Sequence, residues 1–268
     1  MSGAVPALVV SCVRSIRRAV VWWAVSIAVL VALTVAFWPA FRGASGITQA
    51  IETLPTAVID AFGLDSLGTP AGFLRGNLYE LFVPLLFSVA AVALVKGQTA
   101  NDESAGRLEL FLAQPVSRRT LFAARSVACL AGLAVIVVAT IAIQLVSDAV
   151  IGLEIDTGAI FATATLCGLL AAFHASIAFC IACLRPKPSA VLAGGIGVSL
   201  AGYVVSALFP ISTALKPWRV LSPWDWALGG NPLEQASEPW RFIALGVPAV
   251  LLVLIGLWGV TRRDVAAA

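Results

Sequence analysis

Six long apolar runs alternate with shorter polar stretches along this chain of 268 residues. The runs cover approximately residues 19–37, 78–95, 121–146, 159–184, 190–209 and 242–260. A helix needs about 20 apolar residues to cross the hydrocarbon of a bilayer. The pattern therefore predicts an all-α membrane protein with six transmembrane helices. Pro84 and Pro248 fall inside two of the runs and predict kinks there.

Composition agrees with a chain that faces lipid. The sequence is 60% hydrophobic and 12% charged, whereas a soluble domain carries roughly 25% charged residues. No linker rich in Pro, Ser or Gly divides it, so we expect one transmembrane domain over residues 1–268. The net charge of +3 is small and dispersed, which argues against nucleic acid as a partner.

Basic residues collect on one side of the predicted membrane. Positive residues favour the cytoplasmic side of a span, so this bias predicts a multi-pass protein of the inner membrane with both termini in the cytoplasm. The basic residues on that side are Arg14, Arg17, Arg18, Lys96, Arg107, Arg118, Arg119, Arg125, Arg185, Lys187, Arg262 and Arg263. The same rule makes residues 97–120 a cytoplasmic loop and residues 39–77 and 211–240 outer segments.

The N-terminal residues 1–18 precede the first run and carry Arg14, Arg17 and Arg18. We expect an amphipathic helix on the inner membrane surface, with these arginines facing headgroups. A cleaved signal peptide is the alternative, but the following run exceeds the 7–15 residues of a signal core. On the outer side, apolar residues at helical spacing between 47 and 62 predict a helix lying in the interface, and tryptophans in 211–240 are typical of an aromatic belt.

The longest charged stretch of the chain, residues 101–119, lies between the second and third runs. Glu103 and Arg107 are four residues apart and can pair on one helical face. Pro115 ends that short helix, and Ser117 is a candidate N-cap for the next one. Such a helix at the membrane surface could dock into a partner protein, and a solvated loop helix without a partner is the alternative.

This stretch resembles the permease subunits of ABC-2-type ABC transporters. The family pattern of an acidic pair, a glycine, a hydrophobic–acidic–hydrophobic stretch and Pro-Val-Ser-Arg matches the residues of this loop. The matching residues are Asp102, Glu103, Gly106, Leu108, Glu109, Leu110, Pro115, Val116, Ser117 and Arg118. A second likeness is Leu221-Ser-Pro-Trp-Asp-Trp226 followed by Gly229-Gly-Asn-Pro-Leu233.

The resemblance implies an ABC-2, or type V exporter-like, fold in which the loop forms a coupling helix. Two ATPase subunits would bind ATP and Mg²⁺, and a second permease subunit, identical or paralogous, would complete the transporter. No cofactor is expected in this chain, which has no Gly-x-x-x-x-Gly-Lys-Ser/Thr motif. The residues expected to contact the ATPase are Asp102, Glu103, Gly106, Arg107, Glu109, Leu110, Pro115, Val116, Ser117 and Arg118.

A few polar residues lie within the apolar runs. Polar groups at membrane depth are candidates for function, so His174, Gln144, Thr140 and Ser176 are candidate members of a substrate path. The structural alternative is a neutral histidine bonded to a neighbouring helix. The five cysteines all fall in apolar or inner-surface segments, so we expect neither disulfides nor a metal site.

These features together predict a transport subunit without catalytic residues. It would move an amphiphilic compound (a drug, an antibiotic or a lipid-like molecule) out of the cytoplasm or inner leaflet. Two alternatives stay open. An ion- or proton-coupled secondary transporter would need buried carboxylates and often has inverted repeats. A non-transporting membrane protein, such as an assembly factor or an intramembrane enzyme, is the other.

Overall fold

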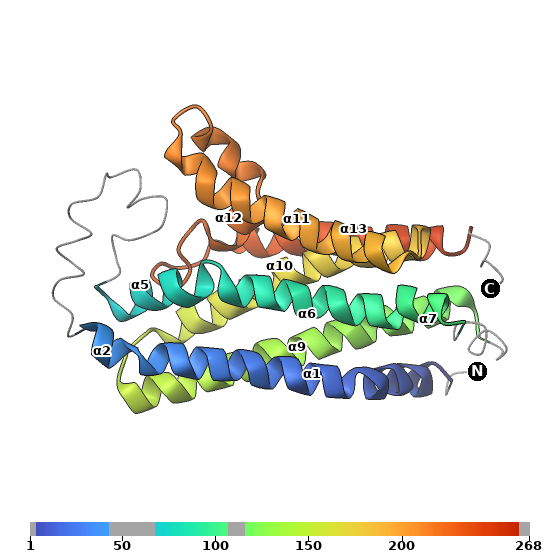
Figure 1. Cartoon of the computed structure of the whole chain (residues 1–268), viewed down its shortest axis with the longest axis horizontal. Helices are drawn as coiled ribbons and strands as arrows, with labels where there is room; N and C mark the ends of the chain where they lie inside the picture. Colours follow the sequence, from blue (N-terminus) through green and yellow to red (C-terminus); the bar gives the residue numbers. More distant parts are fainter. Residues whose placement is uncertain (1–3, 43–67, 107–115, 263–268) are drawn as a thin grey trace.

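The computed structural model describes residues 4–42, 68–106 and 116–262. It is 84% helical, and six of its helical segments are long and apolar enough to cross a membrane. The predicted fold class is thereby confirmed. The six segments are Pro6–Arg42, Pro70–Ser104, Arg118–Ile151, Thr157–Leu184, Pro188–Ile211 and Pro239–Gly259. Figure 1 shows them running side by side along the long axis of the molecule.

Helix α10 (Thr157–Leu184) forms the centre of this bundle. It packs against α6 (Phe82–Gln98), α9 (Arg118–Ile151), α11 (Pro188–Leu208) and α13 (Pro239–Gly259). The apolar windows of the second and fourth spans are 61% buried, whereas those of the fifth and sixth are only 28% buried. The last two spans therefore leave most of their apolar surface on the outside of the chain, where lipid or another subunit can cover it.

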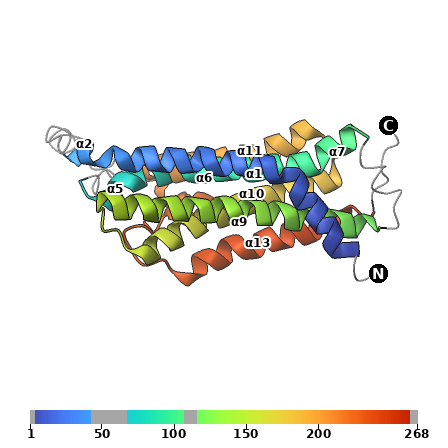
Figure 2. The ribbon, with the colours of Figure 1, turned by 90° about the horizontal axis from the view of Figure 1, so that it is seen from below.

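The N-terminal segment differs from the prediction. Residues 1–18 were expected to form a separate surface helix, but α1 (Ala4–Ala36) continues from that segment through the first span. No glycine or proline occurs between Pro6 and Ala36, so nothing in the sequence ends the helix. The helix bends in its first third (Figure 2), where the Ser15 hydroxyl donates to the Cys12 carbonyl at 2.7 Å. Such back-bonding by serine often bends a helix.

The second span begins earlier than predicted, because part of the expected outer segment 39–77 is helical. Helix α5 (Pro70–Leu74) starts from the N-cap Thr69 and leads into a π-helical turn, η2 (Arg75–Tyr79). On the other flank, α2 (Trp38–Arg42) extends the first span, and its Trp38 packs on Phe73 of α5 with ring centroids 5.3 Å apart. The interfacial helix expected between 47 and 62 lies outside the described residues.

One irregularity in the spans follows from proline. Helix α6 begins only at Phe82, after a break at Glu80 and Leu81. Pro84 has no amide hydrogen for the Glu80 carbonyl, four residues before it, and its ring would collide with that carbonyl. The predicted kink is thus a break one turn before the proline. Pro248 lies inside the uninterrupted α13.

The ends of the helices agree with the topology inferred from charge. The start of α1, the end of α13 and the short α7 (Ala100–Ser104) lie at the same end of the bundle (Figure 1). The opposite end carries α2, α5 and α12 (Pro223–Leu228). An even number of spans requires this arrangement, and it puts residues 97–106 beside the N-terminal part of the chain.

Candidate functional site

A buried ion pair joins the charged loop to the bundle. Asp102 lies on α7, one turn after α6 ends, and its Oδ2 accepts from Nη2 of Arg125 at 2.9 Å. The Arg125 side chain is only 1% exposed, whereas Asp102 is 17% exposed. A charge as deeply buried as this guanidinium needs a partner. The first turns of α9 are therefore tied to the beginning of the loop.

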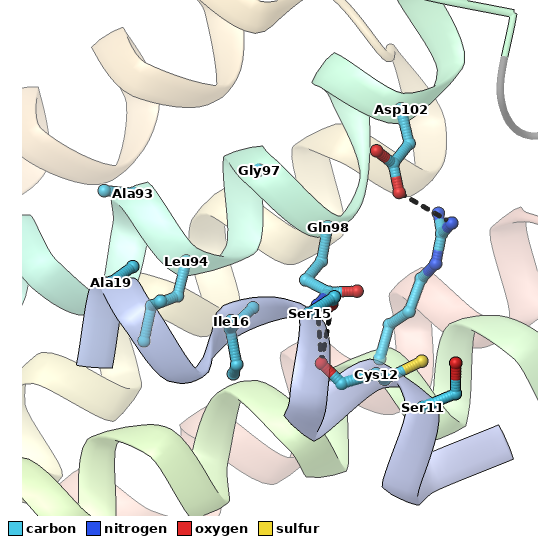
Figure 3. Close-up of a pocket in the computed structure, with 11 residues that line it drawn as sticks. Ser11, Cys12, Ser15, Ile16, Ala19, Ala93, Leu94, Gly97, Gln98 and Asp102 are labelled. Carbon is cyan, nitrogen blue, oxygen red and sulfur yellow. Dashed lines mark hydrogen bonds and ion pairs between the residues drawn. The ribbon is translucent and has the colours of Figure 1, made fainter. Parts of the chain in front are cut away.

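A second set of polar contacts ties α1 to the same place. Nε2 of Gln98, at the end of α6, donates to the Cys12 carbonyl at 3.0 Å and to the Ser15 hydroxyl at 2.6 Å. Both acceptors lie at the bend of α1, as Figure 3 shows. Helices α1, α6 and α9 consequently meet in one polar junction, which lies between the membrane-spanning bundle and the charged loop.

The two ends of the loop have conformations that their sequence explains. Gly106 has φ +69°, a left-handed conformation that costs a side-chain-bearing residue free energy. Ser117 is extended and its hydroxyl accepts from the Thr120 amide at 3.1 Å, so it caps α9 as predicted. Val116 precedes this cap, and Arg118 is the first residue of α9.

Six of the ten predicted contact residues lie in the described part of the chain. Asp102 and Glu103 lie together on α7, which ends at Ser104, and Gly106 follows its C-cap Ala105. Arg107, Glu109, Leu110 and Pro115 lie outside the described residues, and so does the proposed pair between Glu103 and Arg107. Contact with an ATPase stays a prediction for all of them. Sequence reasoning missed the role of Arg125, although a lone arginine two turns into an apolar helix was a signal that it has a buried partner.

Among the candidate path residues, His174 has a clear partner on another helix. Its Nδ1 lies 3.0 Å from the Ser88 hydroxyl on α6, and that hydroxyl donates to the Pro84 carbonyl at 2.7 Å. The Ser88 oxygen is then the acceptor, which places a hydrogen on Nδ1. A histidine bonded to a neighbouring helix was the structural alternative to a role in a substrate path.

A third helix brings another polar group to this level. A Cβ on Gly195 of α11 would touch Val92 and Ala178. Helix α11 runs antiparallel to α6 and α10, so one turn forward on α11 corresponds to one turn back on the other two. Ser199, four residues after Gly195, therefore lies at the level of Ser88 and His174. Ser199 is fully buried, and neither its hydroxyl nor Nε2 of His174 has a hydrogen-bond partner within the described ranges.

The other three candidates are not part of this group. Thr140 and Ser176 donate to carbonyls of their own helices, at 2.9 and 2.7 Å. Gln144 is fully buried on α9, and neither end of its amide has a partner among the residues described. The Gly168–Val137 contact fixes the register of α9 against α10, and at 1.5 Å per residue it puts Gln144 roughly 20 Å from His174 along the bundle. The four residues do not form one cluster, and their part in a substrate path stays a prediction.

The motif near residue 222 builds the opposite end of the bundle. Ser222 caps α12 by accepting from the Trp224 amide at 3.1 Å, and its hydroxyl donates to the Gly202 carbonyl of α11 at 2.6 Å. Trp224 is 1% exposed. The family-like motif at residues 221–226 therefore forms a packed corner between α11 and α12, and its Trp224 does not belong to an exposed aromatic belt.

Arg241 of α13 holds the other end of α12. Its Nη1 donates to the carbonyls of Asp225 and Trp226, at 2.9 and 3.2 Å. A Cβ on Gly230 would lie 2.7 Å from the Arg241 guanidinium, which explains a glycine at this place in the motif. Burial raises the pKa of Asp225, and this effect is opposed by Arg241 and by Arg219, whose Nε lies 2.7 Å from the carboxylate.

Comparison with known proteins identifies the family. The family model for the C-terminal domain of the multidrug efflux system permease Rv1217c matches residues 9–260. No curated protein matches the chain. The family match includes most of the first span and all of the other five, and it confirms the predicted resemblance to a transporter permease. Because it extends over nearly the whole sequence, the chain belongs to the family of the multidrug efflux system permease Rv1217c, C-terminal domain.

Proposed function

We propose that this chain is the membrane-spanning subunit of an ATP-driven exporter for amphiphilic compounds. The observation that carries the proposal is the polar junction at the start of the charged loop, in a chain whose family is that of an efflux permease. Asp102 is paired with the almost fully buried Arg125 of α9, and the neighbouring Gln98 is bonded to α1. A displacement of the loop would move two spans together.

ATP would be bound by other chains. The glycine-rich Gly194-Gly195-Ile196-Gly197 lacks the lysine of a phosphate-binding loop and lies inside α11. Two ATPase subunits would hold ATP and Mg²⁺, and residues 102–118 would dock onto them as the coupling helix. A second permease subunit, identical or paralogous, would cover the apolar faces that α11 and α13 leave exposed.

The proposed direction and cargo rest on charge. The end of the bundle with α7 carries most of the basic residues, so we place it in the cytoplasm, together with both termini. The middle of each span has no charged residue; the charges nearest the hydrocarbon, such as Glu80, Lys96 and Arg125, lie toward the span ends. An apolar or weakly polar cargo fits this lining better than an ion does.

Purification in mild detergent tests the proposal. We expect an ATPase chain with a phosphate-binding loop to co-purify at near-equimolar amounts, and Glu103→Lys to abolish its retention and ATP-dependent efflux. Glu154→Lys is the matched control, because Glu154 is an exposed carboxylate in the short connection from α9 to α10, at the other end of the bundle. Recovery of the chain alone, with efflux that persists in ATP-depleted vesicles under a proton gradient, would overturn the proposal in favour of a secondary transporter.

A further inference from the structure

A pocket of about 490 Å³ opens between α1, α6 and α9 at the end of the bundle that carries α7. Figure 3 shows its lining. One part of the wall is apolar, and the other consists of small hydroxyl groups, an amide and the Asp102–Arg125 pair. The apolar residues are Ile16, Ala19, Ala93 and Leu94, and the polar ones are Ser11, Ser15, Gln98, Asp102 and Arg125.

The pocket is amphipathic in the direction of the membrane normal. Its apolar residues lie toward the middle of α1 and α6, whereas Ser11, Gln98 and Asp102 lie toward the helix ends, near the membrane surface. Two of the polar side chains are buried, since Arg125 is 1% and Gln98 5% exposed. A ligand that filled the pocket would therefore need an apolar tail and a polar head.

Three basic residues are near neighbours of lining residues along α1 and α6. Arg14 follows Ser11 by three residues and precedes Ser15 by one, and Arg18 has the same relation to Ser15 and Ala19, so both border the lining face of α1. Lys96 precedes the lining Gly97 on α6. Both arginines are exposed, and Lys96 is half-buried.

The charges around the pocket favour an anionic head. Arg14, Arg18, Lys96 and Arg125 are positive. Asp102, which lines the pocket and pairs with Arg125, and Glu103, the next residue of α7, are negative. The sum over these six is +2. Basic pockets between helices at a membrane surface bind acidic lipid headgroups, and each nearby Lys or Arg strengthens that attraction about fivefold.

We propose that this pocket binds one anionic phospholipid from the leaflet that meets this end of the bundle. The phosphate lies near Arg14, Arg18 and Lys96, and an acyl chain lies along Ile16 and Leu94. The lipid bridges the bent part of α1 to α6, beside the junction that holds the charged loop. This proposal needs only the membrane-spanning fold and does not depend on ATP-driven transport.

Native mass spectrometry of the delipidated full chain in detergent tests the site, with phosphatidylglycerol and phosphatidylcholine as probes. We expect one phosphatidylglycerol to bind with a preference over phosphatidylcholine of tenfold or more, and Arg14→Ala/Arg18→Ala to weaken it roughly 25-fold. Arg17→Ala is the matched control. Arg17 carries the same charge on the same helix, but at about 3.6 residues per turn it lies on the side opposite Ser15 and Ala19, farther from the lining than Arg14 and Arg18.

A second variant tests the pocket without removing charge. A Cβ on Gly97 would meet no atom within 4 Å, so Gly97→Leu fills the cavity and adds a residue with better helix propensity. We expect it to lose the bound lipid while its thermal stability and elution volume are unchanged. Equal binding of the two lipids, equal weakening by Arg17→Ala, or full retention of the lipid by a folded Gly97→Leu would each overturn the proposal.

Discussion

Removing either partner of the Asp102–Arg125 ion pair should have unequal effects on stability. Asp102→Asn keeps the size of the side chain but removes the carboxylate charge 2.9 Å from the guanidinium, which is 1% exposed. Arg125→Met keeps the apolar stem and leaves behind Asp102, which is 17% exposed and can be hydrated. The first variant weakens the compensation of a positive charge in a low dielectric, whereas the second removes that buried charge.

The burial of the two groups sets the expected magnitudes. Breaking a fully buried pair from one side costs about 3–5 kcal/mol. Because Asp102 is partly exposed, and solvent screens part of the attraction, we expect about 2–3 kcal/mol for Asp102→Asn. Arg125→Met should cost about 1 kcal/mol, mostly through lost packing of the guanidinium near the Phe122 ring, which lies 5.8 Å away. The double variant should be more stable than Asp102→Asn alone, since it no longer contains the buried guanidinium.

Thermal denaturation in detergent ranks the variants by stability. The readout is the fraction of protein that stays monodisperse on size exclusion after heating. We expect Asp102→Asn to have the lowest midpoint, then the double variant, then Arg125→Met. Glu154→Gln removes one exposed carboxylate elsewhere and should match the parent protein. If Arg125→Met were the least stable of the set, or if Asp102→Asn behaved like Glu154→Gln, the ion pair would not be the contact that holds the loop.

Three further predictions concern helix ends and close packing. Ser117→Ala removes the N-cap of the 34-residue α9 and should cost about 1 kcal/mol, which Ser117→Asp restores in the same thermal assay. Gly195→Ala should destabilise by about 1–3 kcal/mol, because its Cβ would lie 2.6 Å from a Val92 methyl, whereas Gly197→Ala meets nothing within 4 Å and should be neutral or stabilising; equal midpoints would contradict the packing of α11 on α6. Arg241→Leu removes two hydrogen bonds to α12 carbonyls and should cost about 2–4 kcal/mol and shift tryptophan emission to the red; unchanged emission would mean that Arg241 does not hold this corner.

The hydropathy pattern was sufficient to predict the number, type and order of the spans. About 20 apolar residues in a row have only one stable conformation in lipid, because every backbone amide must be bonded within the segment. The N-cap at Ser117 and the disturbance before Pro84 were also predictable, since both depend on neighbours within four residues. For the same local reason, the lack of Gly or Pro after Pro6 could have revealed that α1 is continuous.

Only the tertiary structure decided which polar residues meet. Asp102 and Arg125 are 23 residues apart, and Gln98 lies 86 residues from Cys12. His174 was found with Ser88 and not with Gln144, because the register of three helices is set by small-residue contacts such as Gly195 against Val92. The sequence predicts on which face of its helix each residue lies. The residue opposite that face depends on the distance between the two helices and on their relative register.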